Sequence, residues 1–270
     1  MTASEPQFIT VGTGDRARRI ATIAAPAARP GAPGLLWLIG LKSDMGSTKA
    51  EALAGWTAAR GLGFTRFDYS GHGQSGGAFE EATISDWLEE SCAVFRQLTQ
   101  GPQVLVGSST GAHLALLLLR RLMAAHSEDA RRVLGLVLVA PAWDLTELMW
   151  DQLPDDARAR ILTEGQWMRP SAYDPVGYPI TKRFIEDGKT HLFKGTDFDP
   201  GRPVLVLQGA EDRDVPIAHA RALKTVLAGD RVRITEVADG EHRLSRPQDL
   251  DKLYALIDEV LLASRAERAS

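Results

Sequence analysis

The chain has 270 residues, 44% of them hydrophobic, and a formal net charge of −4 at pH 7. That length and apolar content suffice for a large core in one or two domains. The acid excess and the scattered basic residues exclude a strong cationic surface of the kind that holds phosphate backbones, so we expect no nucleic-acid partner.

The N-terminal segment predicts an antiparallel hairpin, because the runs FITV (8–11) and RIATIA (19–24) flank the turn-like GTGD. The N-terminus lacks a basic start followed by an apolar run, and no later segment approaches the roughly 20 apolar residues that cross a bilayer. We therefore expect a cytoplasmic protein without membrane insertion. Cys92, the single cysteine, lies within a predicted helix. We expect it to pack there, although a lone cysteine can also be a nucleophile.

Short apolar runs recur along the chain with helix-like stretches between them. Most of these runs are apolar on both faces, as the buried strands of parallel sheets are. They cover residues 34–40, 64–69, 103–107, 134–140, 203–209 and 232–237. This order predicts an α/β fold with a mostly parallel sheet and helices on both faces.

The starts of three helices can be predicted from their capping residues. Ser47 is expected to cap the first of these helices. Thr83 with Asp86, and Ser245 with Gln248, have the spacing of capping boxes. The last helix should then extend from this box to about residue 264.

Residues 141–200 break the alternation of strands and helices. The strand pattern disappears there, and the composition turns to Trp, Tyr, Met, Pro and Asp. A segment of this length after a strand is too long for a plain loop and is typical of a lid or binding element. We expect a small helical cap over 141–200, on a core formed by 1–140 and 201–270.

Two glycine patterns resemble nucleotide-binding motifs, but the residues that follow them do not fit such a site. SGHGQSG (70–76) contains G-x-G-x-x-G, but the next helix pattern starts only near Thr83, and a dinucleotide motif needs the helix to begin inside it. GTGDRA (12–17) lacks the acidic residue that such a site requires. The histidines are too scattered for a metal site. We therefore expect no cofactor and no metal.

Gly107-Ser108-Ser109-Thr110-Gly111 is a G-x-S-x-G sequence with an apolar strand before it and a helix pattern after it. Strand before and helix after is the context of a nucleophile elbow, in which the flanking glycines let other backbone pass close by. Only Ser109 has glycine two positions before and two positions after it. Ser109 is therefore the predicted nucleophile.

A serine hydroxyl needs a general base, usually histidine, which an acid orients. In the fold that this elbow implies, the chain order is serine, acid, histidine. His242 fits that order, because it directly follows the last predicted strand. The remaining histidines lie too early in the chain or too close to the predicted acid: His72, His113, His126, His191 and His219.

The predicted acid is Asp212, in GAEDRDVP after the strand 203–209, because loops after strand carboxyl ends build the sites of α/β sheets. Glu211 and Asp214 compete for this role in the same loop. Asp144, after the preceding strand, is a further alternative.

The tetrahedral intermediate of such a reaction needs two N–H donors. The backbone of Thr110, directly after the nucleophile, should supply one of them. The second should come from the loop after the strand 34–40, where Leu41 is the best candidate.

In combination, these motifs resemble the α/β-hydrolase family. They are more closely similar to the branch of the mitochondrial palmitoyl-protein thioesterase and mycophenolic acid acyl-glucuronide esterase, with its bacterial relatives. The segments that carry the resemblance span about residues 36–246 and are IGLKSDMGSTKA, RFDYSGHGQSGG, VGSSTGAH, FIEDGKTHL, GAEDRDVP and HRLS. The resemblance implies a nucleophile, acid and base at Ser109, Asp212 and His242, and a structural role for His72 in a turn.

The expected function is that of a serine hydrolase acting on small-molecule carboxylic esters or thioesters. An acyltransferase, a peptidase and a non-catalytic ligand-binding protein of the same fold are the alternatives. Aromatic side chains of the expected cap should line an apolar acyl site, unless they pack within the cap itself: Trp143, Trp150, Trp167, Tyr178 and Phe184. The sequence leaves the oligomeric state open.

Overall fold

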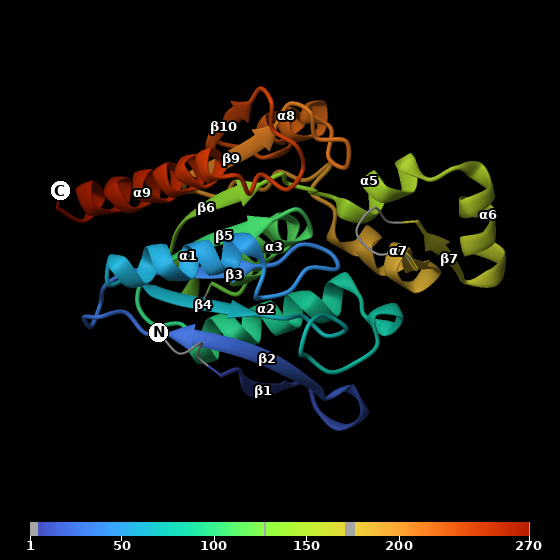
Figure 1. Ribbon diagram of the computed structural model, residues 1–270, viewed down its shortest axis with the longest axis horizontal. Coiled ribbons are helices and arrows are strands. Elements are labelled where there is room, and N and C mark those ends of the chain that lie inside the picture. Colours follow the sequence, from blue (N-terminus) through green and yellow to red (C-terminus); the bar gives the residue numbers. More distant parts are fainter. Residues whose placement is uncertain (1–4, 127, 171–175, 270) are drawn as a thin grey trace.

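A computed structural model of the chain describes residues 5–126, 128–170 and 176–269. Its centre is an eight-stranded sheet with the order β1-β2-β4-β3-β5-β6-β9-β10, seen as one twisted layer in Figure 1. From β4 to β10 neighbouring strands are parallel, whereas β1 pairs with β2, and β2 with β4, in antiparallel fashion. The strands are β1 Gln7–Val11, β2 Arg18–Ala25, β3 Gly34–Leu38, β4 Gly63–Phe67, β5 Gln103–Ser108, β6 Val133–Val139, β9 Val204–Gly209 and β10 Val232–Val237.

Helices cover both faces of the sheet because the strand order reverses after β4. The chain moves outward from β3 through α1 to β4, then back past β3 through α2 to β5. Right-handed crossovers in opposite directions place their helices on opposite faces. In agreement, α1 packs with α9 through stacked Trp56 and Tyr254 rings, and α2 packs with α3. The helices of the main sheet are α1 Thr48–Ala59, α2 Ile84–Leu98, α3 Thr110–Ala124, α4 Glu128–Arg132, α8 Ile217–Val226 and α9 Pro247–Ala269.

The core lies between the central strands and these helices. Every residue of β3, β5 and β9 is buried, which accounts for their unbroken apolar runs. Cys92 packs in this core on α2, as the sequence predicted. Across the described residues, no helix combines the length and the apolar character that a bilayer crossing requires.

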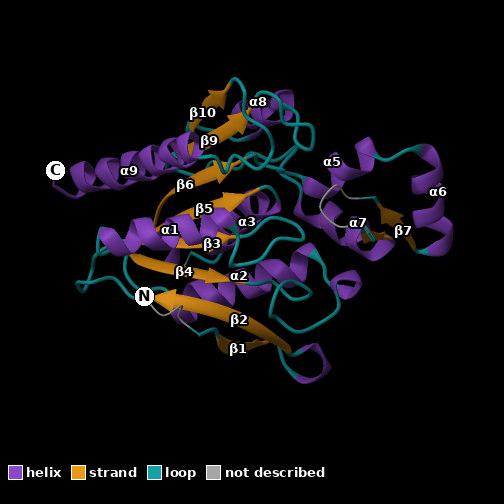
Figure 2. Ribbon diagram, in the orientation of Figure 1, coloured by secondary structure: helices purple, strands orange, loops and turns teal. Residues whose placement is uncertain are grey.

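The segment between β6 and β9 holds the helices α5 Leu145–Gln152, α6 Asp155–Glu164 and α7 Lys182–Gly188. It also contains a hairpin of β7 Gln166–Arg169 and β8 Tyr178–Thr181, which the sequence analysis did not predict and which Figure 2 shows apart from the main sheet. Each of these strands has only four residues, so they are too short to show a clear alternation.

One buried and one half-buried carboxylate hold this segment in place. Asp144, near its start, accepts hydrogen bonds near its end from the N–H groups of Phe193 (2.7 Å) and Lys194 (3.0 Å). Asp187 on α7 accepts the N–H (2.9 Å) and the hydroxyl (2.7 Å) of Ser85 on α2. The sequence FIEDGKTHL thus supplies an attachment point between α7 and the core.

The helix caps differ in how well the sequence predicted them. Thr83 and Asp86 form the predicted capping box at the start of α2. Ser47 occupies the predicted N-cap position of α1, but its side chain makes no capping bond within the described chain. The capping box predicted for Ser245 is wrong. α9 begins at Pro247, and Asp249 accepts the N–H of Arg246 instead (3.1 Å).

Backbones approach very closely where β5 turns into α3. A Cβ atom on Gly111 would lie 2.1 Å from the carbonyl oxygen of Leu38, and one on Gly107 would lie 2.2 Å from the oxygen of Gly111. Side chains are excluded at these two positions, which is the physical reason for the glycines of the G-x-S-x-G sequence.

We predict that Gly111→Ala lowers the free energy of unfolding by about 1–3 kcal/mol, because the backbone must shift to admit the methyl group. Gly55→Ala on α1 is the matched control, since a Cβ there meets no atom within 4 Å. It should stabilise the protein by roughly 0.5–1 kcal/mol, as alanine does in place of helical glycine. Urea denaturation measures both values. Equal effects of the two substitutions would contradict the steric explanation.

Candidate active site

The residues predicted to do chemistry lie at one edge of the sheet. Ser109 follows β5, Asp212 follows β9 and His242 follows β10, while Leu41 follows β3. The carboxyl ends of parallel strands meet at the same edge. Residues from distant parts of the sequence are therefore brought together there.

Ser109 sits on a strained turn between β5 and α3. Its backbone has φ 55° and ψ −115°, a conformation that costs a non-glycine residue about 1–3 kcal/mol. Neighbouring backbone holds it in place, because its N–H donates to Val139 O (2.8 Å) and its carbonyl accepts from Ala112 N (3.0 Å). Ser109 is half-buried at the end of the strand, whereas Ser108 is buried within it. This geometry matches the predicted nucleophile elbow.

Asp212 and His242 form a close pair. Oδ2 of Asp212 lies 2.8 Å from Nδ1 of His242. Oδ1 of Asp212 also accepts the N–H groups of Asp214 and Val215 (both 2.9 Å), while Oδ2 lies 3.2 Å from Nε2 of Gln208. With these donors around it, the carboxylate accepts a hydrogen bond from Nδ1–H of the imidazole. His242 Nε2 is then left as a proton acceptor.

The loops that carry this pair are joined by their backbones. Glu211 N–H donates to Gly240 O, and Ala210 N–H donates to Val237 O (both 2.9 Å). A Cβ on Gly209 would lie 2.3 Å from Gly240 O, so the two loops cross in direct contact. The distance between the acid and the histidine is therefore set by the backbone.

Lys49 on α1 tethers the histidine loop from the other side. Its Nζ donates to Arg243 O (2.5 Å) and lies 3.4 Å from Ser245 Oγ. Burial lowers the pKa of Lys49 to about 8.

Within the described chain, the Ser109 hydroxyl and His242 Nε2 form no side-chain hydrogen bond. Catalytic contacts of this kind often form only once a substrate is bound.

The competing acids have other partners. Asp144 is buried, and its carboxylate is occupied by the N–H groups of Phe193 and Lys194. Glu211 and Asp214 are exposed, and neither carboxylate hydrogen-bonds to a histidine in the described part of the chain. Asp212 is therefore the acid that the structure pairs with His242.

Asp212, Asp214 and His242 also form a cluster whose potential ligand atoms lie within 4.8 Å of one another. The donor set does not fit a metal ion well, because both oxygens of Asp212 already accept hydrogen bonds and Nδ1 of His242 faces one of them. The residues themselves thus give no support for a metal site here.

Two buried histidines support neighbouring loops. His113 accepts Asp144 N–H at Nδ1 (3.3 Å), and its ring packs against Phe193 with centroids 5.8 Å apart. His72 accepts Lys42 N–H at Nε2 (3.1 Å). Burial lowers the pKa of His113 to about 3 and that of His72 to about 4, so both are neutral near pH 7. These contacts agree with the structural role expected for His72 and give His113 a similar role.

Neither of the two predicted N–H donors has a hydrogen-bond partner among the described residues. Thr110 is the first residue of α3, and a helix offers no internal partner to its first N–H groups. Leu41 N–H donates to no other described residue. Gly40, which precedes it, lies against the nucleophile, because a Cβ on Gly40 would be 3.5 Å from Ser109 Cβ.

An apolar pocket adjoins Leu41 at the boundary with the segment 141–200. Tyr178 and Phe184, both predicted to bind the acyl group, line this pocket together with Leu41, Phe79, Met149 and Ile180. Trp143, Trp150 and Trp167 are not among its lining residues. Trp143 instead stacks on the His219 ring (4.3 Å) and donates its indole N–H to His219 O.

Sequence reasoning missed two residues of this region. Phe79 forms a wall of the pocket and packs edge-on against Tyr178, with centroids 5.9 Å apart. Gln208 supports Asp212 from β9. The only sequence signal for Gln208 was a polar residue at the end of an otherwise apolar strand, and Phe79 had none.

Comparison with known proteins agrees with this fold. The family model described as serine aminopeptidase, S33, matches residues 40–173. The Bos taurus protein named palmitoyl-protein thioesterase ABHD10, mitochondrial, is 33% identical over 237 residues, which cover 85% of this chain and 73% of that protein. The expected cytoplasmic location stays a prediction.

Solved structures are similar over nearly the whole chain. A protein of Agrobacterium vitis S4, assigned as a hydrolase, is 43% identical with a TM-score of 0.91, covering 95% of this chain and 98% of that one. Mouse alpha/beta hydrolase domain-containing protein 10 is 27% identical with a TM-score of 0.81, covering 96% and 98%. The chain therefore belongs to the α/β-hydrolase superfamily, in the branch of palmitoyl-protein thioesterase ABHD10.

Proposed function

We propose that the protein is a serine hydrolase that cleaves carboxylic esters or thioesters through an acyl-enzyme on Ser109. The observation that carries the proposal is the hydrogen bond between Asp212 and His242 at the sheet edge where Ser109 occupies its strained turn. The names of the relatives, which include a palmitoyl-protein thioesterase, support the same class of reaction.

In the first half of the reaction, His242 Nε2 takes the proton of Ser109 as its oxygen attacks the acyl carbon. The Leu41 and Thr110 N–H groups stabilise the negative charge that develops on the acyl oxygen. The bond to the leaving alcohol or thiol breaks, and His242 returns the proton to that group. Asp212 keeps the imidazole in the required tautomer and stabilises its cation.

In the second half, His242 takes a proton from water, which attacks the acyl-enzyme and releases the acid. The residues 141–200 act as a cap that shields this intermediate. Tyr178 and Phe184 hold the acyl group in the apolar pocket next to Leu41. The nature of the attacking group separates hydrolysis from acyl transfer, and an amine leaving group would make the enzyme a peptidase.

We predict that Ser109→Ala abolishes both ester hydrolysis and labelling by a fluorophosphonate, while the fold persists. Ser108→Ala is the matched control and should keep most of the activity, because Ser108 is buried in β5. Hydrolysis of a p-nitrophenyl ester, gel-based labelling and circular dichroism measure the three properties. Full labelling of Ser109→Ala, or equal losses in the two variants, would refute the assignment of the nucleophile.

We predict that kcat/KM falls as the pH is lowered below neutrality, because a protonated imidazole has no lone pair to accept the serine proton. The unfolding free energy should also decrease below about pH 6.5. The reason is that the lowered pKa values of His72 and His113 keep them neutral in the folded state while the unfolded chain takes up protons. Activity is therefore measured only where circular dichroism shows intact protein. A profile that stays flat to about pH 4 in folded protein would contradict a histidine base.

We predict that kcat/KM rises with the first methylenes added to the acyl chain by at most about fourfold each, because burial of a methylene is worth about 0.8 kcal/mol and the pocket next to Leu41 is small. Matched oxygen-ester and thioester series with increasing acyl length test this and establish the preferred bond. Tyr178→Ala should flatten the dependence, whereas Tyr178→Phe should preserve it. An unchanged dependence in Tyr178→Ala would remove this residue from the acyl site.

A further inference from the structure

Residues Gly40–Ser43, which carry the proposed donor Leu41, form a turn of unusual composition. Ser43 N–H donates to Gly40 O (3.1 Å), which closes the turn. Leu41 has a negative φ and Lys42 a φ of 57°. This combination is typical of a type II turn, in which glycine or asparagine is favoured at the position that Lys42 occupies. A contact from outside the turn is therefore needed to stabilise Lys42 in this conformation.

His72 supplies a contact to the backbone of this turn, beside the contact of Lys42 Nζ with the Phe79 ring (4.8 Å). Lys42 N–H donates to His72 Nε2 over 3.1 Å. This N–H belongs to the Leu41–Lys42 peptide, whose orientation distinguishes a type II turn from a type I turn. If that peptide turned over, its N–H would point away from the imidazole and this hydrogen bond would be lost.

His72 is itself held in one tautomer. Its Nδ1 lies 3.2 Å from Ser70 O, which can only accept, and Lys42 N–H can only donate. Nδ1 therefore carries the proton and Nε2 the lone pair. The rings of Tyr69, Phe79 and Trp87 surround the imidazole with centroids 5.8, 5.3 and 5.1 Å away.

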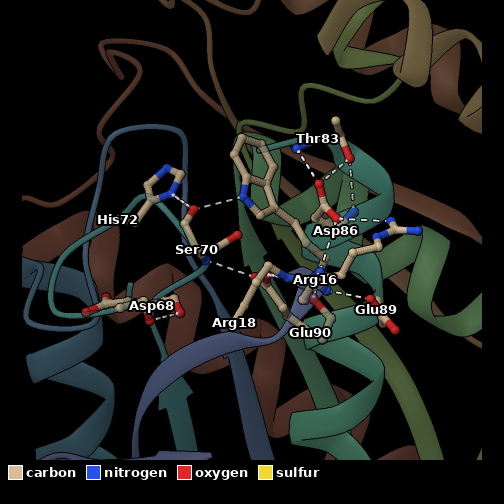
Figure 3. A network of polar contacts seen from close by, with 12 residues as sticks. Arg16, Arg18, Asp68, Ser70, His72, Thr83, Asp86, Glu89 and Glu90 are labelled. Atoms are coloured by element: carbon tan, nitrogen blue, oxygen red, sulfur yellow. Dashed lines mark hydrogen bonds and ion pairs between the residues drawn. The ribbon is translucent and has the colours of Figure 1, made fainter. Parts of the chain in front are cut away.

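The Ser70 backbone is anchored in turn by α2 and β2, as Figure 3 shows. Its carbonyl accepts the indole N–H of Trp87 (3.1 Å), and its N–H donates to Glu90 (2.9 Å). Glu90 is fully buried and pairs with Arg18 Nε at 2.6 Å. A chain of polar contacts thus runs from the antiparallel side of the sheet to the turn beside Ser109.

We propose that His72 is a positioning residue of the oxyanion site: by accepting Lys42 N–H it holds the Gly40–Ser43 turn in place, and the first peptide of that turn presents Leu41 N–H to the acyl oxygen on Ser109. The proposal rests on the proposed function, because it assigns an oxyanion to this position. The Gly40 carbonyl points into the turn toward Ser43 N–H, so the Leu41 N–H of the same trans peptide points out of it.

His72 does not act as an acid or base in this scheme. Both ring nitrogens are engaged by backbone groups, and burial keeps the ring neutral. Its contribution passes entirely through the Leu41–Lys42 peptide. The effect should therefore appear in transition-state binding and not in the binding of substrate.

Two amide variants separate the hydrogen bond from packing. In His72→Gln, the longer amide can place its oxygen near the position of Nε2 and accept from Lys42 N–H. In His72→Asn, the shorter amide can reach Ser70 O near the position of Nδ1 but not Lys42. Both variants lose the imidazole ring, and only His72→Asn can keep the contact to Ser70 O, so a difference in favour of His72→Gln reports the contact to Lys42.

We expect His72→Asn to lower kcat by about 10- to 100-fold with little change in KM, since loss of a whole oxyanion donor costs about 10²–10³-fold. The affinity for a trifluoromethyl ketone, which forms an oxyanion on the nucleophile, should fall by the same factor as kcat/KM. Hydrogen–deuterium exchange over residues 40–46 should accelerate. His72→Gln should remain close to the native protein in all three measurements.

Equal kcat and equal exchange in the two variants would overturn the proposal, as would a loss of kcat without any loss of ketone affinity. The Ser109→Ala variant distinguishes a failure of the proposed function from a failure of the role proposed for His72. Native turnover in Ser109→Ala would refute the proposed function as a whole. Equal behaviour of the two His72 variants, in a protein that Ser109→Ala inactivates, would refute only the role of His72.

Discussion

Close backbone contact at the carboxyl edge of the sheet is the constraint on which this site depends. Gly111 lies on the carbonyl of Leu38, and Gly209 lies on the carbonyl of Gly240, at separations that leave no room for a Cβ atom. The first contact sets the nucleophile loop against the strand that precedes Leu41. The second sets the acid loop against the histidine loop. The proposed catalytic groups are thus placed by backbone positions, which vary less than side-chain rotamers.

Polar contacts orient the groups that the backbone brings together. Asp212 and His72 each determine how one polar partner is oriented: Asp212 fixes the tautomer of His242, and His72 fixes the peptide next to Leu41. Both are buried, and a buried hydrogen bond is costly to leave unmade. The proposed site therefore combines a strained backbone at Ser109 with rigid surroundings, and the core offsets the cost of the strain.

Local sequence patterns predicted the elbow, the parallel strands and the capping box of α2, because each depends on residues that are near one another in the chain. The hairpin β7–β8 was missed, since its strands are short and its stability comes from pairing within the segment 141–200. The cap predicted at Ser245 was wrong because the helix begins one residue later, where Asp249, three residues beyond Arg246, accepts the N–H of Arg246. Trp143 looked like a pocket residue by composition, but it stacks on His219.

The sequence by itself determined the chemistry available to this protein, since the glycine spacing around Ser109 and the chain order of Asp212 and His242 are visible without a structure. Only the tertiary structure decided which groups meet. It paired Asp212, and not Asp144, with His242, and it brought His72 to the backbone of Lys42. The physical reason is that hydrogen bonds act over about 3 Å. Contacts between residues 30 positions apart therefore depend on how the strands are ordered in the sheet.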